Sequence, residues 1–280
     1  MTTAAAAVAA AETTVTTDDG AALAVTVLAP LGTPSGTTVV LAHGWAAARR
    51  VWGTVADRLI REGHRVVLYD QRGHGASTPG REGFTVPRLG ADLGAVLEHV
   101  GAPDAIVAGH SGGGFAALSY VTSGPRELSG LLLLGTAAHD QDTPDSEVRM
   151  MGSALFTRAL RRPALGRKLL GQTMGKGADR RALEVNRQMF AATAPRVRAD
   201  AFRSSRGMDL REPLATVRIP AVVLAGAADR VVAPALGRAV AEALPEARFE
   251  ELPDAGHMLP LETPQEVVRA IRELADRRRG

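Results

Sequence analysis

The sequence predicts an α/β fold: a mostly parallel, eight-stranded, twisted sheet flanked by helices. Short apolar runs alternate with helical stretches along most of the 280 residues, and strands that alternate with helices form a mainly parallel sheet covered on both faces. A chain of this length can bury about three-quarters of the surface that its unfolded form exposes. Hydrophobic residues make up 45% of it and cysteine is absent, so we expect a core of Val, Leu and Ala without disulfides or thiolate metal sites.

The first two strands are expected to form an antiparallel hairpin. Apolar and β-branched residues fill positions 13–17 and 22–28, and Asp18, Asp19 and Gly20 lie between them. An Asp-Gly pair supplies the positive φ angles that a tight hairpin turn needs. This opening pair therefore differs from the parallel arrangement expected of the later strands.

The other strands and helices follow in alternation. Each predicted strand is a short apolar run, and each predicted helix has apolar residues at three- and four-residue spacing. The predicted strands are 37–42, 65–69, 105–108, 128–134, 221–225 and 247–252. The predicted helices are 51–62, 87–100, 112–123, 235–244 and 264–277.

Residues 139–211 interrupt this alternation. The segment contains no convincing strand, carries methionines, and has 15 basic against 8 acidic residues. We expect a helical lid inserted after the sixth strand into a core of residues 13–138 and 212–280. Its positive charge is expected to be a solvated face, although it could attract an anionic substrate or a membrane surface.

Residues 1–12 are expected to be a disordered tail. They have no positive n-region, and Glu12 interrupts them before any long apolar stretch, so they lack the pattern of a signal peptide. No run approaches the ~18 apolar residues of a membrane span. The net charge is only +3, and the basic residues are almost all arginine. We therefore expect a cytoplasmic protein with no nucleic-acid partner and no stable membrane insertion.

A serine lies in the motif Gly109-His110-Ser111-Gly112-Gly113, directly after a predicted strand and directly before a predicted helix. In this context G-x-S-x-G forms a sharp turn that strains the serine backbone, with glycine where a side chain would collide. Gly112 begins the helix, so its N–H points toward negative charge developing on a bound carbonyl oxygen. The motif predicts Ser111 as a nucleophile; the alternative is a glycine-rich loop that binds a phosphate or nothing.

A serine nucleophile needs a base and an acid that orients the base. His257 lies between the last predicted strand and the last predicted helix, and Asp229 follows the preceding strand. The carboxyl ends of parallel strands share one edge of a sheet, so both residues are expected to reach Ser111. Asp140 and Asp142, which follow the preceding strand, are the alternative candidates for the orienting acid. Asp229 could instead cap the N-terminus of a helix.

The order Ser111, Asp229, His257 resembles the order found in α/β-hydrolases, and the resemblance extends from about residue 13 to the C-terminus. Further matches are His43-Gly44-Trp45 after the third strand, residues 70–77 after the fourth, and the helical lid after the sixth.

The resemblance implies an α/β-hydrolase fold with two backbone donors for an oxyanion. These would be the N–H groups of Trp45 and Gly112, and losing one such donor typically costs about two to three orders of magnitude in rate. The loop 70–77 is expected to brace the nucleophile region, with His74 in a structural role.

The resemblance also narrows the chemistry. Dehalogenases and epoxide hydrolases of this fold use aspartate at the nucleophile position, where this chain has Ser111. The stretch from His43 to Trp45 is similar to cofactor-free haloperoxidases and perhydrolases, which typically have Met or Thr where this chain has Gly112. Carbon–carbon bond hydrolases and some thioesterases share the same three catalytic residues and stay open as alternatives.

The sequence suggests four residues that contact substrate. Met258 is next to His257, and Val231 follows Asp229 closely, so the motifs place both at the site. In the lid, Met150 and Phe156 are candidates for a deformable apolar ceiling. The lid's apolar residues could instead pack on the core; these are Met150, Met151, Leu155, Phe156, Met189 and Phe190.

We therefore expect a serine hydrolase, without metal or cofactor, that cleaves a carboxylic ester, lactone or thioester through an acyl-enzyme. Its expected partner is a small-molecule substrate with an apolar acyl group, and the sequence predicts no oligomeric state. One alternative is a haloperoxidase, perhydrolase or carbon–carbon bond hydrolase that uses the same residues. The other is a non-catalytic ligand-binding protein of the same fold.

Overall fold

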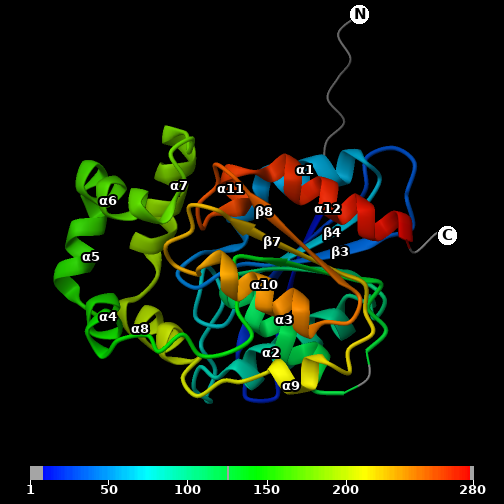
Figure 1. Ribbon diagram of the computed structural model, residues 1–280, viewed down its shortest axis with the longest axis horizontal. Coiled ribbons are helices and arrows are strands. Elements are labelled where there is room, and N and C mark those ends of the chain that lie inside the picture. The colour runs from blue at the N-terminus through cyan, green and yellow to red at the C-terminus, as the bar shows by residue number, and fades with distance from the viewer. Residues whose placement is uncertain (1–8, 125, 278–280) are drawn as a thin grey trace, which may run out of the picture.

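One eight-stranded sheet forms the centre of the molecule (Figure 1). The computed structural model describes residues 9–124 and 126–277. The strands lie in the order β1-β2-β4-β3-β5-β6-β7-β8. Their bounds are β1 (Ala10–Thr16), β2 (Ala22–Leu28), β3 (Thr38–Ala42), β4 (Arg65–Tyr69), β5 (Ile106–His110), β6 (Gly130–Leu134), β7 (Ala221–Gly226) and β8 (Ala247–Leu252).

The strand directions match the sequence prediction. β1 pairs with β2 and β2 with β4 in antiparallel register, and every later pair is parallel. β5 extends two residues beyond its predicted end because His110 pairs with Leu134 of β6. The fold class predicted from the alternation of strands and helices is confirmed.

The predicted boundary of the N-terminal tail is wrong at Ala10–Glu12. These residues belong to β1 and pair with β2, from Ala10 opposite Leu28 to Glu12 opposite Thr26. Since β2 is seven residues long, a partner strand of the same length satisfies its hydrogen-bonding groups along one edge. Residues 1–8 of the predicted tail lie outside the described residues.

Helices cover both faces of the sheet (Figure 1). On one face lie α1 (Gly53–Arg61) and α12 (Pro264–Arg277), which contact each other. On the other face lie α2 (Val86–His99), α3 (Gly112–Thr122) and α10 (Pro234–Ala243). The shorter helical segments of the core are η1 (Arg49–Trp52), α9 (Arg211–Leu214) and α11 (Leu259–Glu262). The central strands β3 to β7 are almost entirely buried because their side chains pack against helices on one face or the other.

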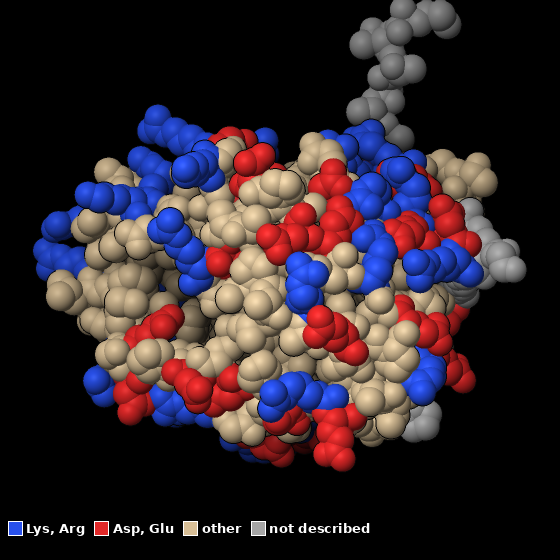
Figure 2. Space-filling view, viewed as in Figure 1, with Lys and Arg blue, Asp and Glu red and all other residues tan. Residues whose placement is uncertain are grey.

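A group of helices, termed here the helical insertion, follows β6 and precedes β7. It comprises α4 (Asp145–Met151), α5 (Ala154–Arg161), α6 (Pro163–Leu170), η2 (Gly171–Thr173), α7 (Arg180–Ala192) and α8 (Pro195–Arg203). It lies at one end of the sheet, at the left of Figure 1. Lys and Arg gather on its outer surface in Figure 2, as expected of a solvated face.

The buried guanidinium of Arg198 connects the helices of the insertion. It donates to the carbonyl oxygens of Met151 at 3.0 Å, Phe190 at 2.9 Å and Thr193 at 2.6 Å, and to Thr157 Oγ1 at 2.5 Å. These acceptors come from α4, from the C-terminal end of α7 and from α5. Burial lowers the pKa of Arg198 because desolvation disfavours the cation. Hydrogen bonds from this one side chain therefore fix the ends of two helices whose residues face the cavity described below.

None of the helices within 9–124 and 126–277 is long and apolar enough to cross a membrane.

Candidate active site

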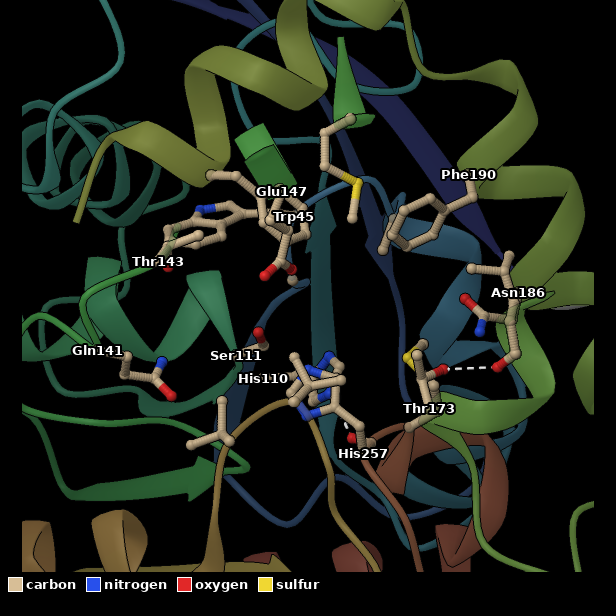
Figure 3. A pocket seen from close by; sticks show the side chains of 18 of the residues that line it. Trp45, His110, Ser111, Gln141, Thr143, Glu147, Thr173, Asn186, Phe190 and His257 are labelled. Atoms are coloured by element: carbon tan, nitrogen blue, oxygen red, sulfur yellow. Dashed lines mark hydrogen bonds between the residues drawn. The ribbon is translucent and has the colours of Figure 1, made fainter. Parts of the chain in front are cut away.

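Ser111 occupies the turn between β5 and α3. Its φ and ψ angles are 51° and −117°, a conformation that residues other than glycine rarely adopt. A Cβ atom at Gly109 would overlap Gly113, and one at Gly113 would overlap the backbone of Ala42. Glycines at these two positions therefore permit the sharp turn, which presents the Ser111 hydroxyl to a cavity (Figure 3).

Gly112 leaves space for the indole of Trp45. A Cβ atom at Gly112 would overlap that ring. The indole also packs against Phe115 of α3 and Phe202 of α8, with ring centroids 5.2 Å and 5.4 Å apart. Haloperoxidases typically have Met or Thr where this chain has Gly112. The glycine is explained by Trp45, whose indole fills the volume that a larger side chain at position 112 would need.

The carboxylate of Asp229 binds the imidazole of His257. His257 Nδ1–H donates to Asp229 Oδ2 at 2.8 Å, and Asp229 Oδ1 accepts the N–H groups of Val231 at 2.8 Å and Val232 at 2.9 Å. Both ionisable side chains are buried. Because the carboxylate accepts a hydrogen bond from the proton on Nδ1, the lone pair lies on Nε2, the nitrogen that could accept a proton from a nucleophile.

The predicted nucleophile and the predicted base meet at one cavity. Ser111 and His257 both line it, and Figure 3 shows their side chains beside each other. No described residue makes a hydrogen bond to the Ser111 hydroxyl, which is therefore available to a substrate. Hydrogen bonds between a nucleophile and its base are often long in an empty site and shorten when substrate binds.

The two predicted oxyanion donors come from loops that meet beside Ser111. Gly112 is the first residue of α3, where backbone N–H groups have no acceptor within the helix. The loop that carries Trp45 approaches closely, since a Cβ atom at Gly44 would lie 3.0 Å from Ser111 Cβ. Both N–H groups therefore lie next to the predicted nucleophile.

The loop 70–77 braces the segment that carries Trp45. Asp70 Oδ1 accepts the N–H of Arg49 at 2.7 Å. His74 Nε2 accepts the N–H of Ala46 at 3.0 Å, and His74 Nδ1–H donates to the carbonyl of Arg72. Burial lowers the pKa of His74 to about 3, so the ring is neutral and can accept that N–H. These contacts give His74 a structural place behind the proposed oxyanion donor.

His110 links the nucleophile strand to the loop of the proposed base. Its Nε2–H donates to the backbone carbonyl of His257 at 2.8 Å. Burial, followed by the repulsion of His257, lowers the pKa of His110 to about 3. Sequence reasoning missed this contact because position 110 is a variable position of the motif, and nothing in the motif indicates what its side chain binds.

Glu262 is a second residue that sequence reasoning missed. Its Oε2 accepts the N–H groups of Gly175 at 2.6 Å and Gly256 at 2.9 Å, and its Oε1 accepts that of Met258 at 2.8 Å. The N–H of His257 donates to the carbonyl of Thr173 at 2.8 Å. The loop on both sides of His257 is therefore fastened to the helical insertion.

The cavity in front of Ser111 has a volume of about 220 Å³. The predicted contact residues Val231 and Met258 line it. Its polar lining residues lie around the rim and far wall in Figure 3. They include Gln141, Thr143, Glu147, Thr173 and Asn186, and the apolar ones include Trp45, Phe115, Met151, Leu170, Phe190 and Phe202.

The prediction that Met150 and Phe156 line the substrate cavity is wrong. Both line a separate, open depression on the outside of the insertion, and Met150 is 44% exposed. Met151 and Phe190 face the cavity instead. Consecutive residues of an α-helix point about 100° apart, so the helix that turns Met151 inward turns Met150 outward.

Asp140 and Asp142, the alternative candidates for the acid, take part in hydrogen bonds that do not involve His257. Asp140 Oδ1 accepts the N–H of Asp142 at 3.0 Å, and Asp140 Oδ2 accepts that of Gly207 at 2.9 Å. The contact with His257 belongs to Asp229. Of the candidate acids, the structure thus brings Asp229 to the imidazole.

Comparison with known proteins shows the family of the chain. A family model described as serine aminopeptidase, S33, matches residues 33–264. The chain belongs to this family of α/β-hydrolases. The α/β-hydrolase is 31% identical over 214 residues to a pimeloyl-[acyl-carrier protein] methyl ester esterase of Stenotrophomonas maltophilia, a match that covers 72% of this chain and 78% of that esterase.

Two further similarities bear on the family. The α/β-hydrolase is 36% identical over 85 residues to a bifunctional esterase/perhydrolase of Acinetobacter calcoaceticus, and the match covers 30% of this chain and 31% of that protein. Among solved structures, an esterase from Rhodococcus sp. ECU1013 superposes with a TM-score of 0.81 at 27% identity, covering 95% of this chain and 98% of that one. The family resemblance predicted from the motifs is confirmed.

Proposed function

We propose that this α/β-hydrolase is a serine hydrolase that cleaves a carboxylic ester, lactone or thioester. One observation carries the proposal: a single cavity contains a strained, unpartnered Ser111 hydroxyl and the imidazole of His257, whose Nδ1–H is already held by Asp229. This is the arrangement in which an imidazole can activate a serine hydroxyl.

In the proposed mechanism, Ser111 Oγ attacks the carbonyl carbon while His257 Nε2 takes its proton. The N–H groups of Trp45 and Gly112 stabilise the oxyanion. When this intermediate collapses, the leaving alcohol or thiol takes the proton from His257 and an acyl-enzyme is left. Water then attacks the acyl carbon with its proton passing to His257. The bond between Ser111 Oγ and the acyl carbon breaks, His257 returns the proton to Oγ, and the acid is released. Asp229 keeps the tautomer correct and stabilises the imidazolium.

The helical insertion acts in this proposal as the lid of the cavity. Met151, Leu170, Phe190 and Phe202 of the insertion line the same cavity as Ser111, so an apolar acyl group fits against them. The two relatives whose names describe ester hydrolysis support a small-molecule ester as substrate.

A second candidate is perhydrolysis, favoured by the similarity to an esterase/perhydrolase. Hydrogen peroxide would replace water as the attacking molecule in the second half of the reaction, and the acyl group would be released as a peracid. The same residues would form the acyl-enzyme, so only the acceptor of the acyl group would differ.

The test is covalent labelling with a fluorophosphonate, followed by turnover of activated esters, lactones and thioesters of graded chain length. We expect an adduct on Ser111 that Ser111→Ala abolishes, and an initial burst of the leaving group. His257→Ala should reduce turnover about as much as Ser111→Ala, since residues that act together are not additive. Labelled protein that turns over esters only with peroxide present, and releases a peracid, would identify a perhydrolase. Protein that neither labels nor turns over any ester would disprove both.

A further inference from the structure

The side-chain amide of Asn186, in the cavity wall, is buried without a hydrogen-bond partner among the described residues. Asn186 is 1% exposed, and neither its Nδ2 nor its Oδ1 is bonded to any described residue. A buried amide left unpaired loses its hydrogen bonds to water without replacement, and buried polar groups without a partner are rare in native proteins. A group that enters the cavity can relieve this cost.

The position of Asn186 on α7 directs it to substrate. Asn186 and Phe190 are four residues apart and therefore lie on the same face of that helix, and both line the cavity with Ser111. Figure 3 shows Asn186 across the view from Ser111, beside Thr173. The Thr173 hydroxyl donates to the carbonyl of Leu170, so its proton is not offered to Asn186.

The charges around the cavity select the kind of group that can pair with this amide. Among the described residues, no arginine or lysine lines the cavity, whereas the carboxylate of Glu147 does, and no described cation pairs with Glu147. Lys and Arg gather instead on the outer surface of the insertion (Figure 2), and the buried guanidinium of Arg198 is bonded to the helices of the insertion. A carboxylate on the substrate would share the cavity with the half-buried carboxylate of Glu147, and like charges repel.

We propose that Asn186 forms a subsite for a neutral group that both donates and accepts hydrogen bonds, a hydroxyl or a primary carboxamide, on the part of the substrate remote from the scissile carbonyl. The proposal rests on the proposed ester-hydrolase function. A hydroxyl or carboxamide accepts from Nδ2–H and donates to Oδ1, so both unpaired atoms of the amide are satisfied at once.

The test uses matched pairs of esters that differ only at the end remote from the ester bond. In one series, p-nitrophenyl esters carry an n-alkanoyl, an ω-hydroxyacyl, an ω-carboxamidoacyl or an ω-carboxyacyl chain of equal length. In the other series, the same end groups are placed on the alcohol of an acetate ester. We compare kcat/KM within each pair for the wild type, Asn186→Leu and the control Gln188→Leu, an exposed position on the same helix outside the cavity.

The expected result is a wild-type preference of about tenfold for the hydroxyl or carboxamide over the alkyl end in one of the two series, as two neutral hydrogen bonds predict. Asn186→Leu should abolish the preference, and Gln188→Leu should keep it. The ω-carboxyacyl ester should be the poorest substrate, and Glu147→Gln should narrow its disadvantage. A wild type without preference in either series, or a preference that survives Asn186→Leu, would overturn the proposal.

Two additions keep the outcome decisive. Asn186→Ala removes both the donor and the acceptor of the amide without adding bulk, so it should lose the carboxamide and hydroxyl preference even if Asn186→Leu fails to fold. Calorimetric binding of the same pairs to Ser111→Ala protein measures the subsite without turnover. Equal binding of the two members of each pair would refute the subsite, while absent turnover with unequal binding would refute only the hydrolase function.

Discussion

His110 Nε2–H donates a 2.8 Å hydrogen bond to the backbone carbonyl of His257. Through this bond, the residue before the proposed nucleophile fixes the main chain of the proposed base, although the two lie 147 positions apart in the sequence. The distance between the two halves of the site thus depends on a neutral, buried imidazole.

The first prediction concerns the pH dependence of stability. The pKa of His110 is lowered from its ordinary 6.5 to about 3 in the folded protein, so the unfolded chain binds the proton first as the pH falls. The contribution of His110 is fully present above pH 6.5 and is lost as the pH falls toward 3. His110→Gln keeps an N–H donor but does not titrate, so its unfolding free energy should fall less steeply than that of the wild type. Urea unfolding at several pH values measures this, and parallel curves would contradict it.

The second prediction separates the candidate acids. Asp229→Asn preserves shape but leaves the imidazole in the wrong tautomer, so kcat for an activated ester should fall by roughly three to four orders of magnitude. Asp140→Asn should stay close to wild type, because the Asp140 carboxylate accepts backbone N–H groups away from His257. A larger loss for Asp140→Asn than for Asp229→Asn would reverse the assignment.

The third prediction tests the packing of Gly112 against Trp45. A Cβ atom at Gly112 would overlap the indole, so Gly112→Ala should lower kcat/KM by roughly two orders of magnitude as the Trp45 loop and its N–H move. Adding Trp45→Leu should restore part of the loss, giving a positive coupling in a double-mutant cycle. Gly177→Ala is the control, since a Cβ there meets no atom within 4 Å. Strictly additive losses would argue against the contact.

The fourth prediction concerns Glu262. All its hydrogen-bond partners are N–H donors to Oε1 or Oε2, so the amide NH2 of Glu262→Gln must face at least one of them. The substitution should cost about 1–3 kcal/mol of unfolding free energy and should lower kcat by loosening the His257 loop. Glu266→Gln, which breaks only an exposed pair with Arg269, should change neither by much. Chemical unfolding and ester turnover on the same samples provide the two readouts.

The sequence predicted the sheet and the proposed catalytic residues because these follow from local rules. Ser111 stands in a motif whose glycines are required by backbone contacts, and Asp229 and His257 follow strands whose carboxyl ends share one edge. These residues are brought together by their neighbours in the chain and in the sheet. The alternation of apolar segments in the sequence is enough to predict that sheet.

The cavity wall could not be predicted in the same way. Whether Met150 or Met151 faces the substrate depends on the rotation of α4 about its axis, and that rotation is set by contacts such as the Arg198 bond to the carbonyl of Met151. The roles of Glu262 and Asn186 likewise depend on how the insertion docks on the core, for which neither residue type nor spacing gives a signal.

Trp45 has two roles, one for its main chain and one for its side chain. Its main chain offers a proposed donor for the negative charge of the reaction, while its ring rests on Phe115 of the core and Phe202 of the insertion. A bulky acyl group that displaces α8 must therefore disturb the very amide that lowers the barrier. Selectivity for acyl size would then appear in the turnover number rather than only in affinity, with poorly fitting esters bound yet hydrolysed slowly.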